Sequence, residues 1–258
     1  MVGRDYLDGV KVLKRSLNRT KLKHPFYILL PDNISKDIAD ELENEKINIL
    51  YTSLLDNEIM GRDNNVDYWK NTLFKLKIFD LTSFEKIVFL DSDMIVFKNL
   101  DNLFSLPHMS AVAAGSELHK DWVRLNSGLM VIEPNHEVYL ELLNIIDQVF
   151  AERQKQGLGV GDQDIINAYY HEWAMKKELQ LSGVYNTMLG YAGYLKKEGT
   201  INDFSEICVY HFTGKEKPWR NKYKEDLIIL LKILKRSKSK LDFMAFKRYK
   251  EVLLELKR

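Results

Sequence analysis

The sequence lacks the usual marks of a secreted or membrane-embedded protein. Its 258 residues include one cysteine, Cys208, so no intramolecular disulfide can form and a reducing compartment is favoured. No apolar run approaches the roughly 20 residues that span a bilayer. The opening segment, MVGRDYLDGV, has neither the basic start nor the apolar core of a signal peptide. We therefore expect a cytoplasmic protein, and the glycosylation sequons at Asn18 and Asn33 carry little weight.

Net charge is also small, at +1, but it is unevenly distributed. Residues 215–258 hold 15 Lys and Arg against 6 Asp and Glu, a net charge of +9. The preceding 214 residues carry 23 basic and 31 acidic side chains, a net charge of −8. A basic C-terminal segment on an acidic body favours an anionic partner, and a solvated pair of basic helices is the simpler explanation.

Apolar spacing predicts helices that alternate with strands up to about residue 90, and mainly strands after it. The alternating part favours a Rossmann-like α/β fold with a mixed, mainly parallel sheet flanked by helices. Helices are expected at residues 5–17, 35–45, 66–81, 137–153 and 162–170. Strands are expected in PFYILL, INILYT, KIVFL, MIVF, AVAA, LMVIEP and ICVYHF. Two basic helices, joined by KRSKSK, then form a C-terminal helical appendage. We expect one domain, residues 1–222, and a basic helical tail, residues 223–258.

Two aspartates, Asp91 and Asp93, directly follow the apolar strand KIVFL. Open parallel sheets bind ligands at the carboxyl ends of their strands. Two carboxylates so close together repel each other, and a divalent cation would relieve this repulsion while leaving room for a diphosphate. Because an isolated DxD is a weak motif, two ordinary loop residues are the alternative explanation.

Three further stretches strengthen the functional interpretation. LNSGLMVIEP places Asn126 at the opening of an apolar strand, and GVGDQDIINAYY places Asp162 and Gln163 at a helix start, where free N–H groups favour anions. In HFTGKEKPW, His211 ends a strand and is followed by Gly214, Lys217 and Trp219. A lone histidine is more often structural. Together with a glycine that admits phosphate and a lysine that attracts it, the histidine is typical of an anion clamp beside a metal ligand.

The stretches FLDSD, LNSGLMVIEP, GDQDIIN and HFTGKEKPW resemble, in order and spacing, the retaining glycosyltransferases of the glycogenin and galactinol synthase family (family 8). The resemblance covers about residues 6–219 and not the tail. It implies the GT-A nucleotide-diphospho-sugar transferase fold. It also implies a metal-dependent hexosyltransferase that moves a hexose from a UDP-sugar to an acceptor hydroxyl. Glucose and galactose are the hexoses expected before others.

The same resemblance implies roles for the residues that match the family's motifs. Asp91, Asp93 and His211 would hold Mn²⁺ (or Mg²⁺), and Gly214 and Lys217 would hold the diphosphate of the donor. The other implied donor-binding residues are Tyr6 near the uracil, Ser92 at the ribose, Lys75, and, along the sugar, Asn126, Asp162 and Gln163. Asp162 and Gln163 are the catalytic candidates beneath the sugar, and both double displacement and front-face attack stay open.

One departure from the family motivates an alternative function. Only MVGRD precedes Tyr6, where family members usually have a strand of the nucleotide floor, so we expect a truncated first strand. A catalytically silent sugar-nucleotide-binding or scaffold protein is therefore the first alternative. A DxD phosphatase with Asp91 as its nucleophile is the second, but it leaves HFTGKEKPW unexplained.

The partners are less well defined than the donor. The acceptor stays open among a saccharide, a polyol, a lipid-linked glycan and a protein tyrosine, with Tyr191 and Tyr194 in the region where glycogenin glucosylates itself. FMAFKRYKEVLLEL makes the tail a candidate for peripheral membrane contact, although packing onto the body is the simpler expectation. The basic tail has no recognisable nucleic-acid-binding motif, so no nucleic-acid partner is expected. The oligomeric state, a homodimer included, stays open.

Overall fold

The computed structural model describes residues 3–55, 72–114, 123–220, 223–236 and 238–256. The chain forms two compact units. Unit 1 contains Met1–Tyr51, Leu90–Ser105 and Ser182–Arg258, and unit 2 contains Thr52–Phe89 and Leu106–Leu181. The polypeptide therefore leaves unit 1 twice and returns to it each time. The division into a transferase domain and a tail at residue 222 stays a prediction.

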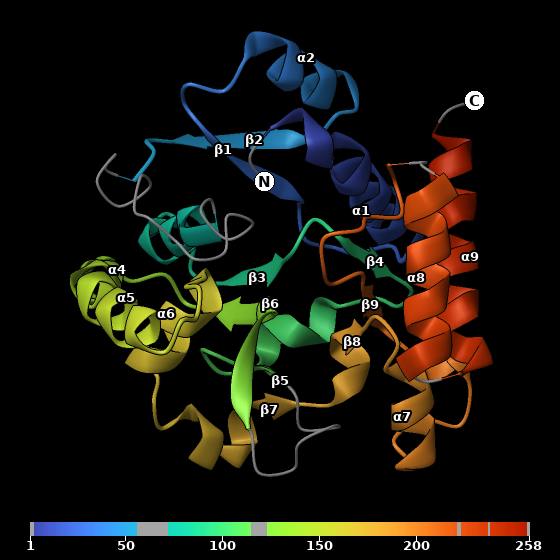
Figure 1. Ribbon diagram of the computed structural model, residues 1–258. Helices are drawn as coiled ribbons and strands as arrows, with labels where there is room; N and C mark the ends of the chain where they lie inside the picture. The colour runs from blue at the N-terminus through green and yellow to red at the C-terminus, as the bar shows by residue number, and fades with distance from the viewer. Residues whose placement is uncertain (1–2, 56–71, 115–122, 221–222, 237, 257–258) are drawn as a thin grey trace. The chain divides into compact units, whose positions relative to one another are not determined.

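Unit 1 is built on a three-stranded sheet of order β4-β9-β8 (Figure 1). The strand β4 (Met94–Val96) is antiparallel to β9 (Val209–His211), which is parallel to β8 (Thr187–Met188). A separate pair of strands, β1 (Tyr27–Pro31) and β2 (Asn48–Thr52), lies between helices in the chain. The α-helices in the described part of this unit are α1 (Leu7–Arg19), α2 (Lys36–Asn44), α7 (Ala192–Lys197), α8 (Tyr223–Arg236) and α9 (Lys240–Glu255).

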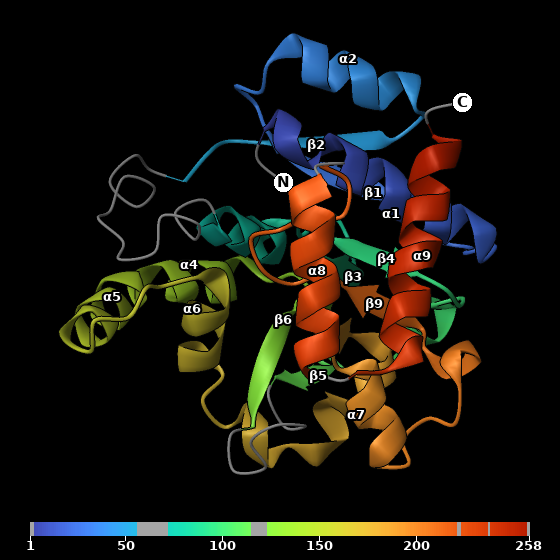
Figure 2. The ribbon, with the colours of Figure 1, turned by 45° about the vertical axis from the view of Figure 1, so that its right-hand side comes forward.

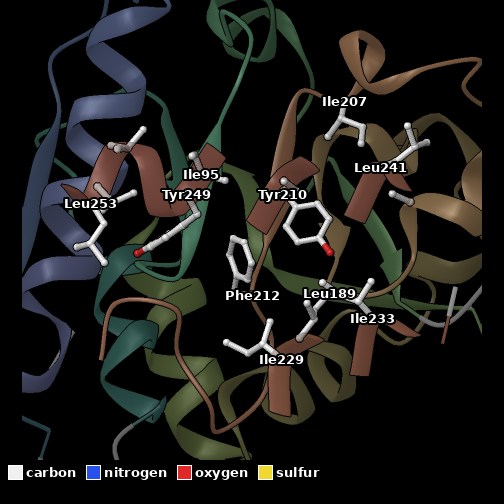
Figure 3. Close-up of a cluster of buried hydrophobic side chains, with 14 of the residues drawn as sticks. Ile95, Leu189, Ile207, Tyr210, Phe212, Ile229, Ile233, Leu241, Tyr249 and Leu253 are labelled. Carbon is white, nitrogen blue, oxygen red and sulfur yellow. The ribbon is translucent and has the colours of Figure 1, made fainter. Parts of the chain in front are cut away.

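The C-terminal helices α8 and α9 form part of the core of unit 1. Ile229 and Ile233 of α8 and Tyr249 of α9 are completely buried, in one cluster with Tyr210 and Phe212 (Figure 3). The Phe212 and Tyr249 rings lie 4.9 Å apart, edge to face. Both predicted helices therefore form, and their apolar stripes pack on the body, which was the simpler of the two expectations for the tail.

A buried carboxylate, Asp242, fixes α9 to the rest of this cluster. Its oxygens accept hydrogen bonds from the Tyr210 hydroxyl at 2.7 Å and from the backbone amides of Ala192 and Gly193 at 3.2 and 3.3 Å. Asp242 is completely buried, so these donors replace the water that the carboxylate loses on folding. These bonds connect β9, the strand that carries His211, to the C-terminal hairpin formed by α8 and α9.

Unit 2 contains a four-stranded sheet of order β3-β6-β5-β7. Its strands are β3 (Ile87–Leu90), β5 (Ala111–Ala114), β6 (Arg124–Ile132) and β7 (Gln180–Leu181). The strand β5 is antiparallel to β6 and parallel to β7. A 3₁₀ helix, Thr72–Asp80, and the α-helices α4 (His136–Asn144), α5 (Ile146–Lys155) and α6 (Asp162–Tyr169) accompany the sheet. The predicted mixed α/β fold is confirmed.

Two predicted helices differ in detail from those observed. The helix expected at 137–153 is two helices, α4 and α5, which meet at Ile145. This junction has no proline or glycine, and the apolar spacing continues across it, so the sequence gives no signal for it. The helix expected at 66–81 is described only from Thr72, where it is a 3₁₀ helix; residues 66–71, with Trp69, lie outside the described residues. Within the described ranges, no helix has the length and apolarity needed to cross a bilayer.

Candidate functional site

The structure brings Asp91, Asp93 and His211 together in unit 1. Asp93 directly precedes β4, His211 ends β9, and the antiparallel register places Met94 opposite His211. The Phe212 amide donates a hydrogen bond of 2.9 Å to the Asp93 carbonyl, which continues the ladder past the strand ends. One ligand atom from each of the three side chains lies within 4.8 Å of the other two. Strand pairing thus joins two motifs that are far apart in the sequence.

A partner that the sequence did not predict, Asn186, orients the imidazole of His211. The His211 Nδ1 atom lies 2.9 Å from Asn186 Oδ1, which can only accept, so Nδ1 carries the proton and donates it. Asn186 is buried and immediately precedes β8, which pairs with β9. His211 Nε2 consequently faces the two carboxylates, at 3.0 Å from Asp93 Oδ1 and 3.8 Å from Asp91 Oδ2.

Two basic side chains hold the carboxylate of Asp93. Besides His211, the Lys217 ammonium donates to Asp93 Oδ2 at 2.5 Å and to the Phe212 carbonyl at 3.1 Å. Burial favours the neutral acid, but the charges and hydrogen bonds of His211 and Lys217 outweigh it and hold the pKa of Asp93 well below its usual range. Lys217 itself has no exposed surface, so its positive charge is fixed at this site.

The other residues expected around the diphosphate and uracil also lie in unit 1. Gly214 has a φ of 103°, which favours glycine, and a Cβ atom there would lie 3.4 Å from Lys232 Nζ. The Tyr6 and Trp219 rings lie 5.5 Å apart, and the Trp219 indole donates to the Asp5 carbonyl at 2.6 Å. The roles proposed for Tyr6 and Gly214 toward a nucleotide stay predictions.

A close approach that the sequence analysis missed fixes the turn between the two aspartates. A Cβ atom at Gly9 of α1 would lie 2.9 Å from the carbonyl oxygen of Ser92 and 3.0 Å from the Trp219 ring. Only glycine therefore lets α1 pack this closely against the Asp91–Asp93 turn. The glycine in RDYLDGV could have suggested such a contact, but not its partner.

Unit 2 gathers a second set of predicted residues around Ser127 of β6. Asp162, at the start of α6, pairs with Lys75 at 2.7 Å through Oδ2, which also accepts a hydrogen bond of 2.6 Å from the Ser127 hydroxyl. Gln163 Oε1 accepts from the Ser127 amide at 3.2 Å. Asn126 is buried, and its Oδ1 accepts from the Gly128 amide at 2.9 Å. Lys75, Asp162 and Gln163 thus converge on Ser127, and Asn126 precedes Ser127 in the chain.

The donor set of unit 1 suits a divalent metal ion. Carboxylate oxygens and a neutral imidazole nitrogen are ligands that Mn²⁺ accepts, and two carboxylates favour hard cations. Asn186 also gives His211 the hydrogen-bonded support that metal-ligating histidines ordinarily have. Asp91, Asp93 and His211 therefore fit such an ion.

Comparison with solved structures defines the class of fold. The galactosyltransferase LgtC, solved with donor and acceptor sugar analogues, aligns with a TM-score of 0.65 and 16% identity, over 97% of this chain and 92% of that chain. The glycosyltransferase GlyE of Streptococcus pneumoniae aligns with a TM-score of 0.55 and 19% identity, over 97% of this chain and 61% of that chain. The chain has the GT-A fold of these glycosyltransferases, as predicted.

Sequence comparison defines the family. The model of glycosyl transferase family 8 matches residues 2–223, and the chain belongs to this family. It is similar to inositol phosphorylceramide glucuronosyltransferase 1 of Arabidopsis thaliana, with 28% identity over 238 residues, which is 85% of this chain. It is also similar to glycogenin-1 of Mus musculus, with 28% identity over 226 residues, 84% of this chain. The chain spans 41% and 63% of these two relatives.

Proposed function

We propose that the chain is a retaining glycosyltransferase that moves a hexose from a UDP-sugar to an acceptor hydroxyl. The observation that carries this proposal is the convergence of Asp91, Asp93 and His211 beside the buried cation of Lys217. Family membership makes group transfer from a nucleotide sugar the first hypothesis for such a site. In this reaction the diphosphate departs as negative charge develops on its oxygens, and no proton is needed to release it.

The residues of unit 1 would bind the diphosphate. A divalent ion, Mn²⁺ or Mg²⁺, held by Asp91, Asp93 and His211 would stabilise the charge of the departing group. Lys217 supplies a second positive charge. Its ammonium pairs with Asp93 and can exchange this partner for a phosphate oxygen. Gly214 permits a phosphate to approach the backbone closely.

The residues of unit 2 would orient the sugar. We propose that Asn126, Asp162, Gln163 and Lys75 line it. Asp162 Oδ2 is held by Lys75 and Ser127, and a carboxylate oxygen with two donors is a weaker nucleophile than an unbound one. This favours a positioning role for Asp162, and hence front-face attack by the acceptor over double displacement.

The identity of the sugar is proposed more broadly than that of the nucleotide. The names of the similar proteins specify glucuronosyl and galactosyl transfer, so a donor screen should include UDP-glucose, UDP-galactose and UDP-glucuronate. Acceptors of the four predicted classes belong in the same screen. The single cysteine, Cys208, is a free buried thiol, which supports the proposed cytoplasmic location.

Calorimetric titration of Mn²⁺ and UDP tests the proposal. We expect metal-dependent UDP binding by the wild type and its loss in Asp93→Ala and His211→Ala, with Glu178→Ala as an exposed carboxylate control. No UDP binding by a folded wild type would overturn the proposal. UDP binding without transfer from any donor would favour the silent scaffold, and phosphate-ester hydrolysis without a nucleotide would favour the phosphatase.

A further inference from the structure

The outer face of α8 carries a stripe of exposed apolar side chains. Tyr223, Leu227, Leu231 and Leu234 are 85%, 45%, 53% and 47% exposed. Their spacing of four, four and three residues places them on one side of the helix. This side is turned away from Ile229 and Ile233, which are buried in the core of unit 1. Since α8 already packs through its inner face, the outer stripe needs another explanation.

Exposed basic side chains surround the end of this stripe, where α8 turns into α9. The basic residues of this turn are all exposed: Lys235, Arg236, Lys238 and Lys240. The side chain of Met244, one helical turn after Lys240 in α9, is 42% exposed. Between residues 232 and 248 the sequence has one acidic residue, Asp242, and its side chain is completely buried. The two helices lie side by side in both views (Figures 1 and 2). The tip of the hairpin is therefore both apolar and positively charged.

We propose that the outer face of α8 and the adjoining α8–α9 turn bind the surface of an anionic membrane. A helix that combines leucines with flanking lysines can bury its apolar face at the headgroup boundary while its cations contact anionic lipids. The sequence pointed to α9 for such contact, but Tyr249, Val252 and Leu253 of that helix are buried. The membrane-facing residues are therefore those of α8 and the turn.

Charge and composition disfavour two other occupants of this surface. A second copy would bring the same basic cluster against itself, and like charges facing each other repel. Nucleic acid would match the lysines, but it would leave the leucine stripe without an apolar partner. An anionic lipid surface matches both features. The surface contains none of the proposed metal or donor residues, so this proposal can fail while the transferase proposal stands.

Point variants of the full chain provide the test. Deleting α8 and α9 would uncover Phe212 and Tyr210, so a deletion would confound membrane binding with unfolding. Flotation with phosphatidylcholine vesicles, with and without phosphatidylglycerol, measures binding without any donor. We expect binding only to the anionic vesicles, weakened by salt. Lys235→Ala/Lys238→Ala should lower it about 25-fold and Leu231→Ser/Leu234→Ser about tenfold or more.

Matched controls separate this surface from general effects of charge and hydrophobicity. Leu140 and Leu158 of unit 2 are 45% and 43% exposed, so Leu140→Ser/Leu158→Ser controls for the leucine pair. Lys36→Ala/Lys155→Ala controls for the lysine pair. Near-UV circular dichroism confirms the fold of each variant.

Four results would overturn the proposal. One is absence of binding by the wild type to anionic vesicles. Another is equal loss of binding in the control pairs, and an unchanged affinity of the α8 variants would count against it as much. A dimer in solution that Leu231→Ser/Leu234→Ser dissociates would assign the stripe to a second copy instead.

Discussion

Lys217 is a buried cation bonded to a carboxylate that is also a proposed metal ligand. Its ammonium at 2.5 Å from Asp93 Oδ2 and a divalent ion on the same carboxylate repel each other. A nucleotide diphosphate relieves this repulsion because it attracts both cations. Metal and nucleotide should therefore bind with positive coupling through Lys217.

Replacing Lys217 by methionine tests that coupling. We expect Lys217→Met to bind Mn²⁺ at least about tenfold more tightly than the wild type without UDP, because one repelling charge is gone. The affinity for UDP in the presence of Mn²⁺ should fall. Electron paramagnetic resonance of free Mn²⁺ measures the first and calorimetry the second. Equal loss of both affinities would contradict the model, since it would mean that the variant has simply lost the site.

Asn186 acts on the same site through His211. Asn186→Ala removes the acceptor that fixes the imidazole tautomer, and such supporting partners are worth about 10- to 100-fold in metal affinity. We expect a loss of this size for Mn²⁺, with Asn202→Ala, an exposed asparagine, as the control. Rescue by Asn186→Asp, which restores the acceptor, would separate orientation from packing. An unchanged Mn²⁺ affinity in Asn186→Ala would show that Asn186 does not have this role.

The grouping of Asp91, Asp93 and His211 could be predicted from the sequence, whereas the contact of Asn186 with His211 could not. Asp91, Asp93 and His211 belong to motifs whose chemistry is visible in the residues themselves. Asn186 matters because β8 pairs with β9 in one particular register, Met188 opposite His211, and a two-residue strand has no periodic signal. Ser127 follows Asn126 at the opening of a predicted strand, but its contacts with Asp162 and Gln163 depend on tertiary packing.

At the scale of elements, the approach of α1 to the Asp91–Asp93 turn depends on Gly9. Alanine has an intrinsic helix advantage of up to about 1 kcal/mol over glycine. A Cβ atom 2.9 Å from the Ser92 carbonyl must displace either the helix or the turn, and such overpacking costs about 1–3 kcal/mol. We expect Gly9→Ala to lower the free energy of unfolding in urea and to weaken Mn²⁺ binding. A more stable variant with normal metal affinity would show that the contact is loose.

Elements with strong periodicity were the most predictable ones. The helices of the C-terminal hairpin follow from their leucine spacing, and Ser239, whose hydroxyl accepts from the Leu241 amide, marks the start of α9. The break at Ile145 was not predictable, because no residue there forbids a continuous helix. The sequence did not indicate which face of α8 stays exposed, because apolar side chains occupy both its inner and its outer side.

At the scale of the whole molecule, several carboxylates connect stability to pH. The hydrogen bond from Lys232 lowers the pKa of Glu216, the hydrogen bonds from Ser205 lower that of Asp203, and His211 and Lys217 lower that of Asp93 against the effect of burial. A carboxyl whose pKa is lower in the folded state binds protons more readily when unfolded. These groups therefore stabilise the fold above about pH 4, and that contribution is lost as the pH falls further.

Thermal unfolding measured from pH 6 to pH 2, about two pH units above and below the ordinary carboxyl pKa, tests this direction of the pH dependence. We expect the melting temperature to decrease below about pH 4 and to recover little with salt, because the Asp93 pair is buried. Asp93→Asn/Lys217→Met, which removes both charges, should show a shallower decrease than the wild type. Glu178→Gln, which changes an exposed carboxylate outside this set, should follow the wild-type slope closely. A melting temperature that rises on acidification would contradict the assignment.

The order in which the ribosome delivers the chain follows from the way unit 1 is assembled. Asp93 and Lys217, which meet in one ion pair, are 124 positions apart, and β5, β6, α4, α5 and α6 are all translated between them. Such long-range contacts form late in folding. Much of unit 2 can therefore acquire structure on the nascent chain before unit 1 has its central strand pair. The residues proposed to hold the cation come together only when β9 has been translated, and α9 then closes the cluster behind them.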